Sequence, residues 1–191
     1  LIIALALIMI ILVSQFNSFV KPAIIMFSVV MSTIGVFGGL ATFKMDFIVI
    51  MTGIGIVSLA GVVVNNAIVL IDYIGLLKKM KKKELSLGEG DYLPHDVARQ
   101  CIIDAGRTRL RPVLLTAITT ILGLMPLAVG FNIDFLSFFN TFDPDIYFGG
   151  DNSLFWGPMS WTVIFGLSFA TFLTLVIVPS LYHVLYEAKV A

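Results

Sequence analysis

Long apolar runs constrain what this chain can fold into more than any other feature of its sequence. A helix of about 20 apolar residues crosses the roughly 30 Å hydrocarbon layer of a bilayer. Five stretches with few charges meet or approach that length, and they occupy residues 1–19, 23–43, 47–77, 112–130 and 155–185. Only 13% of the residues are charged and the mean hydropathy is +1.03, so lipid is the main solvent of the chain. The sequence predicts an all-α, polytopic membrane bundle of five transmembrane helices.

The segments between these spans predict the rest of the organisation. Residues 78–111 form a polar loop that contains an amphipathic helix, which lies on the membrane surface or connects the spans as a solvated helix. The fourth span is expected to begin at Pro112 and end at Gly130, because proline suits a first helical turn and glycine a helix end. The aromatic loop at residues 131–154 is expected to hold a short re-entrant or interfacial segment.

The distribution of basic residues predicts the orientation. Nine of the twelve Lys and Arg residues lie between Lys78 and Arg111, although the formal net charge of the chain is zero. Loops rich in Lys and Arg stay in the cytoplasm. Residues 78–111 and the C-terminus are therefore expected on the cytoplasmic side, and residues 131–154 on the outer side.

Small and polar residues mark faces where helices are expected to pack. In lipid, glycine allows close approach of two helices, and dispersion and hydrogen bonds hold them together. The second span carries three such residues and the third carries a four-residue repeat that makes a narrow ridge: Gly35, Gly38 and Gly39, then Gly53, Val57, Gly61 and Asn65. We expect Gly53 and Gly61 to be helix-packing residues.

Two adjacent amides, Asn65 and Asn66, lie inside the third span, about 10 Å along the helix axis from Asp72. Amides exposed to lipid are costly, so at least one is expected to bond to a neighbouring helix. The physics alone favours interhelical glue over a proton carrier, because an amide does not titrate.

Three motifs carry a family resemblance. The first is GVVVNNAIVLIDY at residues 61–73, the second RTRLRPVLLT at residues 107–116 followed by GLMPL at residues 123–127, and the third VPSLY at residues 178–182, preceded by Gly157, Pro158 and Thr171. In this order they resemble the tenth, eleventh and twelfth helices of resistance-nodulation-division exporters. The resemblance covers essentially the whole chain.

The resemblance implies half of a twelve-helix membrane domain in the bacterial inner membrane. It further implies export driven by proton flow, with hydrophobic or amphiphilic compounds as substrates, and usually a homotrimer with a periplasmic adaptor and an outer-membrane channel. The spans lack clustered Met, Cys or acidic residues, which disfavours a metal-ion exporter only weakly. The chain would need the N-terminal half of the same transporter and would be inactive alone. A related assembly factor that translocates protein or lipid, or an inert structural remnant, are the alternatives. The resemblance implies neither an enzyme nor a cofactor, and no nucleic-acid partner or metal cluster is expected.

The resemblance also assigns candidate proton-relay residues. In the multidrug members a Lys on the tenth helix, and a Thr and an Arg on the eleventh, communicate with two Asp residues in the other half. Those positions are Asn65, Thr116 and Arg109 here. Asn65 cannot supply the positive charge of the Lys, so hydrogen bonds from Asn65, Asn66 and Thr116 would have to bias the protonation of the acids. For Arg109 the plain alternative is an anchor in lipid phosphate. Thr119 and Thr120 share the helix face of Thr116 and are expected to bond to preceding carbonyls of their own helix.

Overall fold

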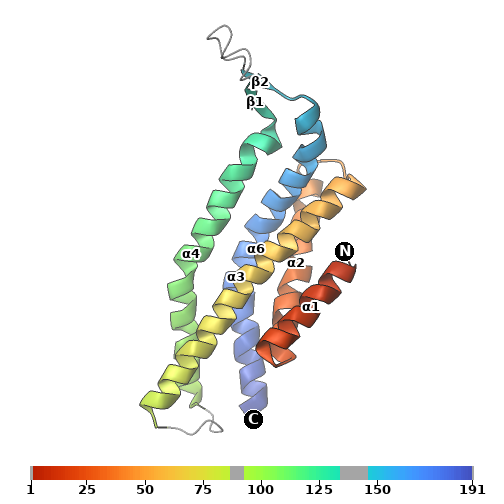
Figure 1. Cartoon of the computed structure of the whole chain (residues 1–191). Helices are drawn as coiled ribbons and strands as arrows, with labels where there is room; N and C mark the ends of the chain where they lie inside the picture. The colour runs from red at the N-terminus through yellow and green to blue at the C-terminus, as the bar shows by residue number, and fades with distance from the viewer. Residues whose placement is uncertain (1, 87–92, 134–145, 191) are drawn as a thin grey trace.

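The computed structural model describes residues 2–86, 93–133 and 146–190, which form an elongated bundle of helices (Figure 1). The helices are α1 (Ile2–Phe16), α2 (Val20–Thr42), α3 (Val49–Glu84), α4 (His95–Val129) and α6 (Asp151–Val190). Between α4 and α6 two short strands, β1 (Phe131–Ile133) and β2 (Ile146–Phe148), pair in antiparallel register. The predicted helical bundle is confirmed, and the strand pair is an addition that the sequence did not predict.

Four of the described helices are long and apolar enough to cross a membrane, namely α2, α3, α4 and α6. α1 is apolar but has 15 residues, which at ~1.5 Å each cover about 22 Å. That length is shorter than a hydrocarbon layer of roughly 30 Å. The structure thus supports a multi-pass membrane protein, and the expected count of five spans is not confirmed.

α4 corrects the predicted division at Pro112. The expected surface helix and fourth span are one continuous helix of 35 residues, and Pro112 and Pro126 both lie inside it. A proline inside a helix loses one backbone hydrogen bond, but membrane helices tolerate that loss where neighbouring groups satisfy the backbone. The predicted end is confirmed: Gly130 has a left-handed conformation with φ of 78°, and its N–H donates to the Pro126 carbonyl.

The loop that follows α4 ends earlier in the sequence than predicted. α6 begins at Asp151, four residues before the expected start at residue 155. The strands β1 and β2 take the two ends of the loop, and Asn132 Nδ2 donates to the Gly130 carbonyl at 3.0 Å. The expected re-entrant segment falls largely on residues 134–145, which lie outside the described residues.

α6 is the central helix of the bundle. It contacts α2, α3 and α4 more extensively than these three helices contact one another. Close approach at glycines explains part of this packing, because a Cβ at Gly35 or Gly39 of α2 would collide with Phe169 or Phe165 of α6. Gly38, by contrast, faces open space. The predicted small-residue face of α2 is therefore confirmed at two of its three glycines.

Candidate functional site

A stripe of exposed residues follows α3 at helical spacing. It contains Ser58, Gly61, Asn65 and Asp72, which recur every three, four or seven positions and share one face of the helix. A Cβ at Gly53 or Gly61 would meet nothing within 4 Å. No other described helix packs closely on Gly53 or Gly61. Their role in helix packing therefore remains a prediction, and it would involve a segment outside this chain.

Asn65 and Asn66 point in different directions. Asn65 is exposed, whereas Asn66 is buried with 8% of its surface exposed. Adjacent residues on a helix point about 100° apart, which is enough to put one amide inside the bundle and leave its neighbour outside. The two candidates therefore have different surroundings, and Asn65 is the one available to another membrane segment.

Thr116 is exposed on α4, and its hydroxyl donates to the Val113 carbonyl at 2.9 Å. Thr119 and Thr120 likewise donate to carbonyls three or four residues back, at 2.7–3.1 Å. The bonding within the helix that was expected of Thr119 and Thr120 is thus confirmed, and Thr116 bonds in the same way. Each oxygen still keeps acceptor capacity for a protonated group on another helix.

Arg109 contacts α3 through Tyr73. Its guanidinium carbon lies 4.5 Å from the centre of the Tyr73 ring, and its buried Nε has no hydrogen-bond partner among the residues that the structure describes. A cation over an aromatic face is worth about 0.5–2 kcal/mol, more when it is desolvated. Arg109 therefore lies in the contact between α3 and α4, and its partner Tyr73 was missed by the sequence reasoning.

The Arg109–Tyr73 contact also defines relative depth along the bundle. α3 and α4 run in opposite directions (Figure 1). Asn65 precedes Tyr73 by eight residues, or ~12 Å of helix, and Thr116 follows Arg109 by seven residues, or ~10 Å. Asn65 and Thr116 therefore lie at nearly the same depth, one on each helix, while Arg109 lies closer to the basic end.

The basic end of the bundle holds a buried lysine that the sequence reasoning also missed. Lys78 is 8% exposed, and its Nζ lies 3.4 Å from the ring centre of Tyr186 and 4.6 Å from that of Tyr182. The Tyr186 hydroxyl donates to the Leu93 carbonyl at 3.2 Å. This cluster joins α3, α6 and the segment that leads into α4. The sequence signal that could have indicated this cluster is the spacing of the two tyrosines, which are four residues apart and so share one helix face.

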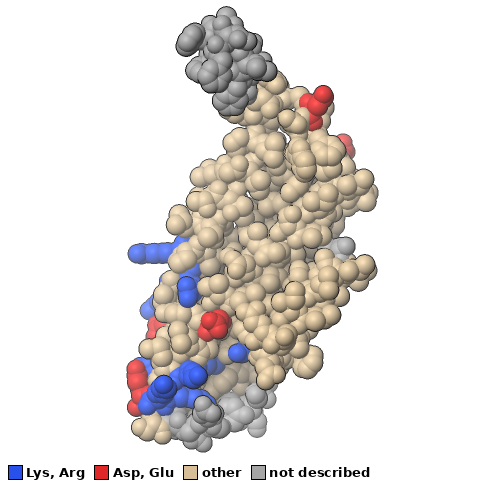
Figure 2. All heavy atoms as spheres, in the orientation of Figure 1, with Lys and Arg blue, Asp and Glu red and all other residues tan. Residues whose placement is uncertain are grey.

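Three other lysines near Lys78 are exposed, namely Lys79, Lys81 and Lys83. Lys and Arg side chains gather at the end of the bundle where α3 ends and α4 begins (Figure 2). Lys81 forms an exposed ion pair with Glu84 at 2.6 Å. Among the residues that the structure describes, no group of three or more His, Cys, Asp or Glu side chains could hold a metal ion.

These features define a class of protein: a multi-pass membrane bundle with polar side chains on an uncovered face. The model of the AcrB/AcrD/AcrF family matches residues 1–133. The chain therefore belongs to that family, and the predicted relationship to resistance-nodulation-division efflux transporters is confirmed.

Individual relatives agree with the family assignment. The chain is 36% identical over 186 residues to the swarming motility protein SwrC of Bacillus subtilis, and the match covers 97% of the chain and 15% of SwrC. It is 27% identical over 179 residues to the multidrug resistance protein MdtC of Erwinia tasmaniensis, covering 94% of the chain and 14% of MdtC. A crystal structure of a heavy metal efflux pump has a TM-score of 0.68 with 28% identity, covering 94% of the chain and 14% of the pump. The chain thus spans about 15% of the length of these relatives.

Proposed function

We propose that the chain is the C-terminal half of the membrane domain of a secondary exporter driven by the proton-motive force. The family assignment supports this function. The structural observation on which the proposal depends most is the uncovered polar stripe on α3. Polar groups at membrane depth are costly against lipid and normally face another helix or a water-filled cavity. A partner helix bundle over Asn65 and Thr116 would remove that cost.

The equal depth of Asn65 and Thr116 suits a shared contact with acids on the partner half. An ionised carboxylate there would accept a hydrogen bond from the Asn65 amide, whereas a protonated one would donate to either oxygen. The two protonation states would then prefer different positions of α3 and α4, which is how proton binding can move helices. Arg109 would act on this equilibrium from about 10 Å away by its charge.

The wider assignment follows the family resemblance and the charge distribution. The basic end of the bundle and the C-terminus would face the cytoplasm of a bacterial inner membrane. The protein would work as a homotrimer with the N-terminal half of the same transporter, a periplasmic adaptor and an outer-membrane channel. We propose hydrophobic or amphiphilic compounds as substrates. The chain alone would not transport, because the proposed acids lie outside it.

The test is export by the full-length transporter that carries this segment. Thr116→Ala and Asn65→Ala should each reduce proton-driven efflux at unchanged expression, because each removes a hydrogen-bonding group from the proposed relay. Thr33→Ala is the matched control, since Thr33 also donates to a carbonyl of its own helix, at 2.6 Å, and lies on α2, which carries none of the proposed relay residues. Normal export by both Asn65 and Thr116 variants would remove these residues from the relay.

A further inference from the structure

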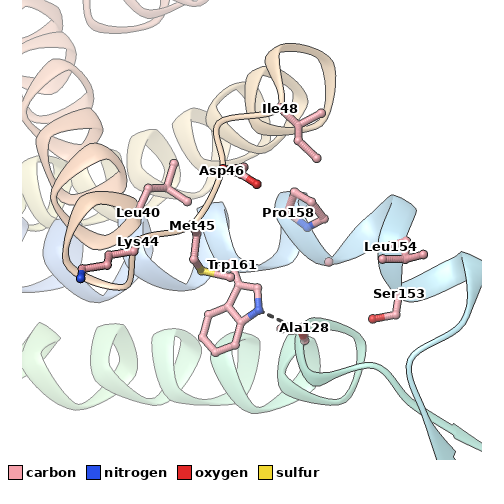
Figure 3. Close-up of a pocket in the computed structure, with 11 residues that line it drawn as sticks. Leu40, Lys44, Met45, Asp46, Ile48, Ala128, Ser153, Leu154, Pro158 and Trp161 are labelled. Carbon is pink, nitrogen blue, oxygen red and sulfur yellow. Dashed lines mark hydrogen bonds between the residues drawn. The ribbon is translucent and has the colours of Figure 1, made fainter.

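A pocket lies at the end of the bundle opposite the lysine cluster. It has a volume of about 350 Å³ and is formed by the end of α2, the loop before α3, the end of α4 and the first turns of α6 (Figure 3). That volume is within the range of ligand sites in proteins. Several helices end or begin here, and in a membrane bundle helix ends would lie at the depth of the lipid headgroups.

Most of the pocket wall is apolar, and Trp161 is fixed in it by two contacts. Leu40, Met45, Leu154 and Trp161 line it. Trp161 Nε1 donates to the Ala128 carbonyl at 2.8 Å, and its ring stacks on Phe165 with centres 5.3 Å apart. Tryptophan is enriched at membrane interfaces because its apolar ring and polar N–H suit that depth. The wall is therefore suited to a hydrocarbon chain.

Two oppositely charged side chains line the same pocket. Lys44 and Asp46 both line it, and in Figure 3 their charged groups point to different sides, with the carboxylate on the side of Pro158. Lys44 has a left-handed backbone conformation with φ of 52°, which turns the chain between them. In the described part of the chain these two side chains form no ion pair with each other. Each charge is therefore available to an external group.

We propose that this pocket binds a zwitterionic phospholipid of the phosphoethanolamine type. The ammonium of the headgroup would approach Asp46, the phosphate would approach Lys44, and an acyl chain would lie along the apolar wall. Charge complementarity selects this occupant: an anionic lipid would satisfy Lys44 but oppose Asp46, and a soluble ion would leave the apolar wall unused. The lipid site is independent of whether the protein exports anything.

The test measures lipids retained by the full-length transporter that carries this segment. The purified protein is exchanged into vesicles of phosphatidylethanolamine and phosphatidylglycerol in equal amounts, re-extracted, and its bound lipids are counted by native mass spectrometry. The wild-type protein should retain phosphatidylethanolamine in preference to phosphatidylglycerol. Asp46→Asn should lower that preference by about threefold to tenfold, the size expected for loss of one charged contact.

Lys44→Gln should lower retention of both lipids, because both carry a phosphate. Lys81→Gln is the matched control, since it removes a lysine charge at the other end of the bundle and should leave retention unchanged. The proposal is overturned if the wild-type protein retains the two lipids equally. It is also overturned if the Asp46 and Lys44 variants match the Lys81 control, which is the result expected if another part of the transporter covers the pocket.

Discussion

The helices α2, α6 and α4 are almost equally apolar, but a much smaller share of α4 than of α2 and α6 is buried within the bundle. The most apolar stretches of α2, α4 and α6 have mean hydropathies of 2.1, 2.0 and 2.2. Yet 44% and 50% of the residues are buried in those of α2 and α6, against 17% in that of α4. Hydropathy therefore predicts which segments enter lipid, and says little about which of them find a partner within this chain.

Close approach at glycines accounts for part of this difference. Helices associate in lipid by close packing, since lipid tails are as apolar as the side chains. α2 offers Gly35 and Gly39 to the rings of α6, whereas a Cβ at Gly123 of α4 would meet nothing within 4 Å. Most of α4 is therefore left uncovered by the other helices. Its buried residues are few and mostly small: Ala98, Cys101, Ile102, Ala105, Val113, Ala117 and Ala128.

The largest expected effect tests the packed side of this comparison. Gly35→Ala puts a methyl group where the Cβ and ring of Phe169 already lie, so α2 and α6 must separate. Overpacking of this kind costs about 1–3 kcal/mol. Gly38→Ala is the matched control and should cost nothing, because its Cβ faces open space. Denaturant unfolding in detergent compares the two, and equal losses would show that close approach does not hold the helices together.

The next effect concerns the attachment of α4 at the basic end. Tyr186→Leu removes the nearer of the two rings that contact Lys78 and the bond to the Leu93 carbonyl, and leaves the buried ammonium with the more distant ring of Tyr182. We expect a loss of about 2 kcal/mol in stability. Tyr186→Phe keeps the ring and should lose about 1 kcal/mol or less. If both variants lose the same amount, the cation contact contributes nothing.

A smaller effect is expected at the opposite end of α4. Trp161→Phe keeps an aromatic ring beside Phe165 but loses the hydrogen bond to the Ala128 carbonyl. The expected loss is about 0.5–1.5 kcal/mol. Hydrogen exchange should report it as faster exchange in the last turns of α4, with α2 unaffected. Unchanged exchange near Ala128 would mean that other contacts hold this end.

The smallest effect is expected at the surface. Lys81→Gln breaks the 2.6 Å ion pair with Glu84, whose side chains are 49% and 59% exposed respectively. Exposed ion pairs contribute little, because water and salt screen them. Thermal unfolding should show no measurable change. A clear loss would mean that this exposed ion pair does stabilise α3.

Local rules predicted the features that depend on nearby residues. Four of the five predicted spans, the glycine at the end of α4 and the hydroxyl bonds within helices agree with the structure. They follow from hydropathy, backbone conformation and short-range hydrogen bonding. The start at Pro112 was predicted by the same rules and was wrong, because a single lost hydrogen bond does not end a helix that has favourable contacts on both sides.

The amino-acid sequence by itself determined that this protein is a membrane helix bundle of the AcrB/AcrD/AcrF family, because length, hydropathy and motifs are properties of contiguous residues. Only the tertiary structure decided that Asn66 turns inward while Asn65 stays exposed, that Tyr73 receives Arg109, and that Lys78 is buried between tyrosines. These pairings join residues on different helices, and their geometry depends on how the helices pack.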